Sequence, residues 1–207
     1  MKNLYYLCTR FLESFEQMAH HLLNVTPTLS NAADLAKIFH FKSEHTAKNY
    51  LEYLKQAFLL VGVKKYAHKS RTRMTQEKLY AVDVAMMNQR ADAFAGENLG
   101  WRLENVVLLH LLRKCKVNGW DIYYMKERSR ECDFLICEGQ NVLQAIQVSY
   151  DISQAKTRKR EINGLLLASQ LTQCTNLLLL TDYEYGEVDL NNHHISIRPV
   201  YDWACEQ

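Results

Sequence analysis

The spacing of apolar residues changes period along the chain, and this change constrains the fold more than any other sequence feature. Over residues 4–23, and again over 99–116, apolar residues recur every three or four positions, which is typical of amphipathic helices. Residues 122–148 instead carry three short runs typical of strands, and a purely apolar strand is predicted near residues 177–180. The order helix, three strands, helix, strand predicts a mixed α/β fold for the second half.

The first half has the pattern of a helical module followed by a hairpin. Thr28-Leu-Ser30 is predicted to cap a second helix over 31–39, and a third helix, which contains Lys48, is predicted over 44–60. Two strands over 60–66 and 79–82 flank a polar stretch that contains Lys69, Arg71 and Arg73. This order predicts a winged-helix module over residues 1–90. Such modules bind either DNA or a protein partner, and exposed Lys and Arg are also ordinary in loops.

Polar residues stand out within three apolar elements of the predicted second domain, residues 91–207. Glu104 lies in the apolar helix, Asp133 lies in the second strand, and Gln147-Val-Ser149 ends the third. Because Asp is disfavoured in strands and needs a partner if buried, Asp133 is the strongest single candidate for a functional residue. Glu104 has an alternative interpretation, an ion pair with Arg102 or Arg113 on its own helix.

Composition excludes several classes of protein. A formal net charge of only +2 excludes a globally basic nucleic-acid binder, although a local patch remains compatible with it. No phosphate-binding loop is present, and the six cysteines form no Cys-x-x-Cys pair, which argues against a structural zinc site. Charged residues interrupt every apolar run long enough to cross a bilayer, and no secretory leader is recognisable. These features predict a cytoplasmic protein without a membrane partner.

Six short blocks resemble one known family, and they occur in the same order. The blocks are His45-Thr-Ala-Lys-Asn-Tyr-Leu51, Lys78-Leu-Tyr-Ala-Val-Asp83, Gly100-Trp-Arg-Leu-Glu-Asn-Val-Val107, Glu131-Cys-Asp-Phe134, Ile146-Gln-Val-Ser149 and Thr157-Arg-Lys-Arg-Glu-Ile162. Over nearly its whole length the chain resembles the uncharacterised C-terminal region that follows the ATPase core in many prokaryotic AAA-type ATPases. The resemblance implies a winged helix followed by a restriction-endonuclease-like αβββαβ domain of the PD-(D/E)XK type. It also implies that the ATPase core is missing here, and we expect the chain to be part of a longer product.

The resemblance implies a metal-dependent nuclease site that has lost part of its machinery. Such a site uses two acidic ligands for Mg²⁺ and a lysine that orients water. The family pattern carries Glu-x-Lys on the third strand, whereas this chain has Gln147 and Ser149 there. Asp133, Gln147 and Glu104 would be the ligands if any metal binds, but one anionic ligand and the cationic helper are lost. Catalysis is therefore disfavoured, and Mg²⁺ is only a candidate cofactor.

Three functional hypotheses follow. The first is a DNA- or partner-binding module of an ATPase system, with the nuclease fold retained as a scaffold. The second is an active Mg²⁺-dependent DNA phosphodiesterase that uses Glu104, Asp133 and Gln147. The third is a regulator acting alone, as a homo-oligomer that reads DNA through the winged helix. Arg158 and Arg160, in a basic run at the start of the later helix, are further candidate DNA contacts, although a solvated charged face is an equally good interpretation.

Overall fold

The computed structural model describes residues 2–67, 77–88 and 99–206, and the chain divides into two compact units. One unit comprises Met1–Gly62 with Gln76–Ala95, and the other comprises Val63–Thr75 with Gly96–Gln207. The prediction of a mixed α/β protein is confirmed. None of the helices in the described ranges is both long enough and apolar enough to span a membrane.

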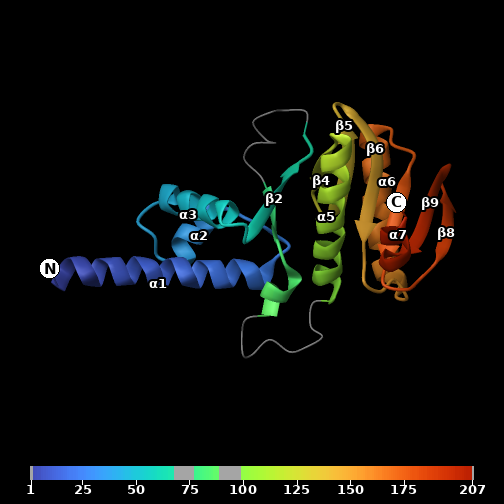
Figure 1. Ribbon diagram of the computed structural model, residues 1–207. Helices are drawn as coiled ribbons and strands as arrows, with labels where there is room; N and C mark the ends of the chain where they lie inside the picture. The colour runs from blue at the N-terminus through green and yellow to red at the C-terminus, as the bar shows by residue number, and fades with distance from the viewer. Residues whose placement is uncertain (1, 68–76, 89–98, 207) are drawn as a thin grey trace. The chain divides into compact units, whose positions relative to one another are not determined.

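The first unit is built mainly from helices (Figure 1). Its elements are α1 (Lys2–Val25), β1 (Thr28–Leu29), α2 (Ala32–Ile38), α3 (Glu44–Gln56), the start of β2 (Leu60–Lys65), β3 (Glu77–Ala81) and the short 3₁₀ helix η1 (Val84–Asn88). β1 pairs antiparallel with β3, and β3 lies next to β2. Apolar residues of α1, α2, α3 and the strands form one core, which includes Met18, Leu35 and Leu54.

The caps of α2 and α3 explain where these helices begin. The side chain of Asn31 accepts a hydrogen bond from the Ala33 N–H, and that of Ser43 accepts one from the Thr46 N–H. The predicted cap at residues 28–30 is therefore wrong by one residue, because Thr28 and Leu29 pair with β3 instead. The predicted start of α3 at residue 44 is confirmed, but its predicted end at residue 60 is wrong, because the helix ends at Gln56 and Leu60 begins β2.

The second unit contains a mixed sheet covered by helices on both faces (Figure 1). Its elements are α5 (Leu99–Asn118), β4 (Asp121–Glu127), β5 (Arg130–Glu138), β6 (Asn141–Val148), α6 (Ala155–Thr172), β7 (Leu177–Thr181), β8 (Gly186–Leu190), β9 (His193–Pro199) and α7 (Val200–Cys205). The strand order is β2-β4-β5-β6-β7-β9-β8, with β2 contributing Lys64 and Lys65. β4, β5 and β6 run antiparallel in turn, whereas β6, β7 and β9 run parallel.

A β-bulge in β5 decides which side chains face α6. Tyr123 pairs with Leu135 and Met125 pairs with Cys132, so β5 holds one more residue than β4 over this step. As a result Cys132 and Leu135 both join the core beneath α6, and Cys137 lies in that same core. Strict alternation along a strand would place Cys132 and Cys137, five residues apart, on opposite faces; this prediction is wrong here because alternation fails at a bulge.

Helix α6 approaches β5 unusually closely at Gly164. A Cβ atom at this position would lie 2.1 Å from the carbonyl oxygen of Glu131, so no side chain fits between the helix and the strand. Around this contact, buried residues of α6 such as Leu165 and Ala168 pack on the sheet. The close contact places the first turns of α6 next to the ends of β5 and β6, where the candidate site lies.

Candidate functional site

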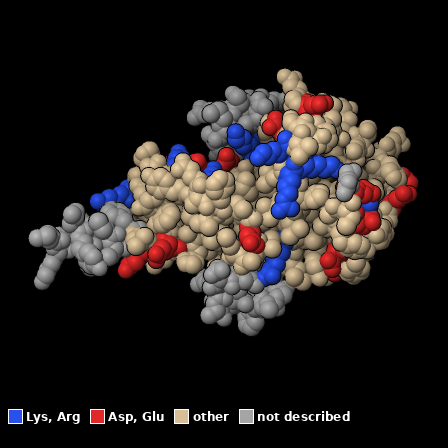
Figure 2. All heavy atoms as spheres, viewed as in Figure 1, with Lys and Arg blue, Asp and Glu red and all other residues tan. Residues whose placement is uncertain are grey.

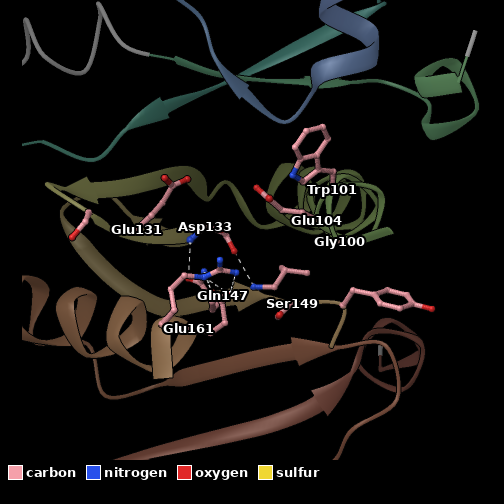
Figure 3. A pocket seen from close by; sticks show the side chains of 12 residues that line it. Gly100, Trp101, Glu104, Glu131, Asp133, Gln147, Ser149 and Glu161 are labelled. Atoms are coloured by element: carbon pink, nitrogen blue, oxygen red, sulfur yellow. Dashed lines mark hydrogen bonds and ion pairs between the residues drawn. The ribbon is translucent and has the colours of Figure 1, made fainter. Parts of the chain in front are cut away.

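Side chains from four elements of the second unit converge on one pocket of about 440 Å³. Its lining consists of Gly100, Trp101, Glu104, Ser129, Glu131, Asp133, Gln147, Val148, Ser149, Tyr150, Arg160 and Glu161. The pocket therefore brings together four residues singled out from the sequence: Glu104, Asp133, Gln147 and Ser149. Figure 3 shows Glu104 on α5 reaching towards Asp133, with Gln147 and Glu161 on the other side of the pocket.

Asp133 lies at the bulge of β5 and is tied to the neighbouring strand. Its Oδ2 accepts a hydrogen bond of 2.9 Å from the Val148 N–H, and its own N–H donates to Oε1 of Gln147 over 3.3 Å. Only 5% of the residue is exposed. The β5–β6 pairing ends at Phe134 and Ile146, so beyond this pair side chains replace backbone groups as hydrogen-bond partners and hold the carboxylate at the pocket.

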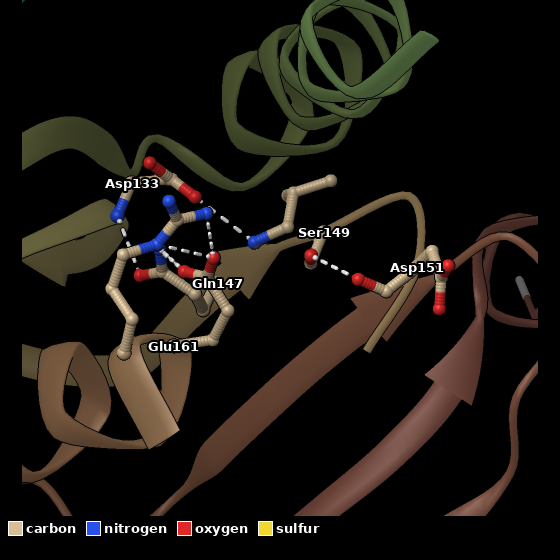
Figure 4. Close-up of polar contacts among 7 residues, drawn as sticks. Asp133, Gln147, Ser149, Asp151 and Glu161 are labelled. Carbon is tan, nitrogen blue, oxygen red and sulfur yellow. Dashed lines mark hydrogen bonds and ion pairs between the residues drawn. The ribbon is translucent and has the colours of Figure 1, made fainter. Parts of the chain in front are cut away.

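Gln147 is held between two groups of the protein. Besides accepting from the Asp133 N–H, its amide donates a hydrogen bond of 2.7 Å from Nε2 to Oε2 of Glu161 (Figure 4). Glu161 is buried, with 3% of the residue exposed, and its Oε1 accepts a 2.9 Å hydrogen bond from Nε of Arg160 and also pairs with Nη2. The negative charge on this side of the pocket is therefore carried by α6, and Arg160 neutralises it from the surface.

Ser149 directly follows the last residue of β6 and begins the loop after it. Its hydroxyl donates a hydrogen bond of 3.2 Å to the backbone oxygen of Asp151 (Figure 4). The carboxylate of Asp151 accepts a bond of 2.7 Å from the Ser153 N–H, which lowers the pKa of Asp151. The hydroxyl thus orders the loop after β6. A serine here cannot supply the positive charge of the lysine that the resemblance implies at this position.

The first turn of α5 forms another wall of the pocket. Glu104, with 8% of the residue exposed, lies one turn after Gly100 and Trp101. A Cβ atom on Gly100 would lie 3.9 Å from Cβ of Tyr150, so the helix start and the loop after β6 are in contact. The carboxylate of Asp182 raises the pKa of Tyr150. This part of the pocket is both aromatic and acidic.

The donor set fits a divalent cation only in part. Asp133 and Glu104 bring carboxylate oxygens, which Mg²⁺ prefers, but the third candidate, Gln147, is neutral and its oxygen already accepts an N–H. Among residues 2–67, 77–88 and 99–206, no group of three or more His, Cys, Asp or Glu is arranged to hold a metal ion. Glu131 also lines the pocket, and it pairs with Lys126 over 2.8 Å. This donor set does not fit the two-acid-plus-lysine machinery of metal-dependent hydrolysis.

The basic residues proposed for DNA contact fall into three groups. Lys48 is exposed on α3 and pairs with Glu44 over 2.7 Å. Arg158 is exposed in the first turn of α6, and Arg160 pairs with Glu161. Lys69, Arg71 and Arg73 lie outside the described residues. On the face drawn in Figure 2, both signs of charge occur among the described residues, and in places Lys or Arg side chains lie directly beside Asp or Glu.

Sequence reasoning did not assign Trp101, Tyr150 or Glu161 to the pocket. In the sequence Glu161 directly follows the basic run that contains Arg158 and Arg160, so it has the pattern of a residue that neutralises those charges on a solvated face. A signal was available in its spacing, because Glu161, Leu165 and Ala168 lie on one face of α6 and all three are buried. An acid on the buried face of a helix requires a polar partner, and here the partners are Gln147 and Arg160.

Comparisons with known proteins match the chain to one domain model and to two longer proteins. Residues 7–97 match the model of a domain of unknown function, DUF8612. The chain is 32% identical over 184 residues to an uncharacterized protein of Methanocaldococcus jannaschii, covering 86% of this chain and 40% of that protein. It is 28% identical over 165 residues to an uncharacterized protein of Haemophilus influenzae, covering 79% of this chain and 38% of that protein. No solved structure matches the chain significantly. The chain therefore spans about two fifths of the length of these two relatives.

Proposed function

We propose that the chain is a nuclease-like DNA-binding module that does not cleave DNA efficiently. The observation that carries this proposal is the convergence of Glu104, Asp133, Gln147 and Ser149 on one pocket. This convergence supports a restriction-endonuclease-like arrangement of the second unit. The order of α2, α3, β2 and β3 supports a winged-helix module in the first.

The contacts of Gln147 argue against efficient catalysis. A nuclease needs a second acid and a cation near the scissile phosphate, but Gln147 is neutral and Ser149 uses its hydroxyl on the backbone of Asp151. Arg160 is the one cation of the described pocket lining, and it is engaged with Glu161. In our proposal Asp133 and Glu104 hold a divalent cation weakly against a DNA phosphate, and Arg158 adds a contact outside the pocket.

The size of the relatives supports a role within a larger system. Both relatives are longer than the region that matches this chain. We propose that the module works with an ATPase partner, in line with the family resemblance. The ATPase would supply the energy-dependent step and this module the attachment to DNA.

Metal and DNA binding by the whole chain test the proposal. Calorimetric titration with Mg²⁺ and Mn²⁺ should give weak binding that Asp133→Asn abolishes and that Asp189→Asn, an exposed carboxylate on β8 outside the pocket lining, preserves. The Asp133→Asn variant should also lose most metal-dependent affinity for a short DNA duplex or single strand. Absence of metal binding at millimolar concentration, together with absence of measurable DNA affinity in the wild type, would sink the proposal and favour a protein-docking module.

One observation favours the second candidate, an active Mg²⁺-dependent nuclease. Glu161 places a buried carboxylate 2.7 Å from the amide nitrogen of Gln147, next to the position where the expected acid is absent. If this carboxylate completes a working site, the protein will nick supercoiled plasmid in Mg²⁺, and both Asp133→Asn and Glu161→Gln will abolish nicking. Intact plasmid after long incubation with Mg²⁺ or Mn²⁺ would exclude this candidate.

A further inference from the structure

We propose that the pocket takes single-stranded rather than duplex DNA, with one unpaired base stacked on Trp101. This inference rests on the proposed function, because it names the form of DNA that the same pocket would bind. Two features carry it: the depth at which the polar groups lie, and the aromatic side chains placed beside them.

The polar groups of the pocket are recessed. Asp133 and Gln147 are each 5% exposed, so a phosphate, with the cation that the proposed function places between it and Asp133, has to enter the pocket to approach them. A volume of about 440 Å³ accommodates a nucleotide-sized ligand but not a base pair with both of its strands. Duplex DNA is stiff over such short distances, whereas a single strand bends freely into a recess. The depth of the polar groups therefore selects for an unpaired strand.

Trp101 is placed to receive the base that accompanies such a phosphate. It belongs to the pocket lining, and 42% of the residue is exposed, so the side chain is accessible to a ligand. Figure 3 shows it next to Glu104 on α5, on the opposite side of the pocket from Glu161. Tyr150 lines the same pocket, and its Cβ lies against Gly100, the residue before Trp101. Bases of any sequence stack on such rings, which provides affinity without sequence specificity.

The test uses a fluorescently labelled 12-nucleotide dT strand and the same strand annealed to its dA complement, each in Mg²⁺ and in EDTA. Wild type should bind the single strand several-fold more tightly than the duplex. Trp101→Ala should weaken single-strand binding about tenfold, the effect of losing one base stack, and leave duplex binding unchanged. Trp101→Phe should retain most of the affinity, because it keeps a ring. Val106→Ala is the matched control, since Val106 is 41% exposed on the same helix and lies outside the pocket lining.

Two outcomes would overturn the inference: tighter binding of the duplex by wild type, or equal effects of Trp101→Ala and Val106→Ala on the single strand. The proposed function fails separately, through the metal titration and the Asp133→Asn variant. Asp133-dependent metal and DNA binding with no effect of Trp101→Ala would therefore refute the stacking inference alone. Thermal unfolding of each variant distinguishes lost binding from lost folding.

Discussion

Nε2 of Gln147 lies 2.7 Å from Oε2 of Glu161, and this hydrogen bond joins the end of β6 to the first turns of α6. Both residues are buried, and both line the pocket. The pair shows how a neutral side chain at the third-strand position is accommodated, because an amide can donate to the helix carboxylate whereas a second carboxylate there would repel it.

The Gln147–Glu161 hydrogen bond predicts a charge-swap rescue. Gln147→Glu should lower the free energy of unfolding by roughly 3 kcal/mol at pH 7, because it places two buried carboxylates in contact. The double variant Gln147→Glu/Glu161→Gln restores one donor and one carboxylate, and should recover most of that loss. Urea denaturation of the wild type, Gln147→Glu, Glu161→Gln and the double variant measures the coupling free energy between the two side chains. Additive effects of the two substitutions would show that the hydrogen bond does not form in solution.

Gly164 should not tolerate even a methyl group. In a typical helix Gly→Ala is stabilising, but here the new Cβ would meet the Glu131 carbonyl oxygen at 2.1 Å and push α6 away from β5. We expect Gly164→Ala to cost about 1–3 kcal/mol in urea denaturation, as overpacking does. Lys159→Ala, on the exposed side of the same helix, is the control and should change stability little. A stabilised Gly164→Ala protein would contradict the close packing of α6.

The pKa values of two histidines should be shifted in opposite directions from the ordinary value. A hydrogen bond from His194 Nδ1 to Asp189, at 2.9 Å, raises the pKa of His194, whereas burial and the nearby Lys114 and Arg113 lower that of His110. The raised pKa means that the His194 pair adds stability below the unfolded value near 6.5, and this contribution is lost as pH rises through the folded value. For His110, whose pKa is lowered, the effect on stability is the opposite: protonation at low pH favours the unfolded chain, so stability falls as pH falls. NMR titration of the imidazole protons should give the higher midpoint for His194, and Asp189→Asn should lower it.

Thiol reactivity should follow burial. Burial raises the pKa of Cys137 to about 12 and that of Cys115 to about 11, and it raises the pKa of Cys132 as well. Cys205 is exposed. Because the thiolate is the reactive form, brief iodoacetamide treatment at pH 8 should label Cys205 while leaving Cys115, Cys132 and Cys137 unmodified. Peptide mass mapping, with protein unfolded in urea as the fully labelled control, measures this. Early labelling of Cys137 would show that this core opens readily.

Much of the local structure could be predicted from sequence periodicity alone. The helices over 4–23 and 99–116 and the strands near 132–136, 142–148 and 177–180 follow from apolar spacing, and the structure contains all of them. β1, β8 and α7 were not predicted. β1 has only two residues and α7 only six. Neither element is long enough for a periodic spacing of apolar residues to be recognised in the sequence. β8 is largely exposed and lacks an apolar face.

The sequence by itself determined which residue types were available to the site: an acid in a helix, an acid in a strand, and a neutral Gln147 and Ser149 at the end of another strand. Only the tertiary structure decided how they are used. The bulge at Asp133 depends on pairing with β4, and the contact of Glu161 with Gln147 depends on Gly164 letting α6 approach β5. Residues distant in the chain supply these contacts, so local periodicity carries no information about them. For that reason Asp133 could be singled out in advance, whereas the place of Glu161 and Trp101 in the pocket could not.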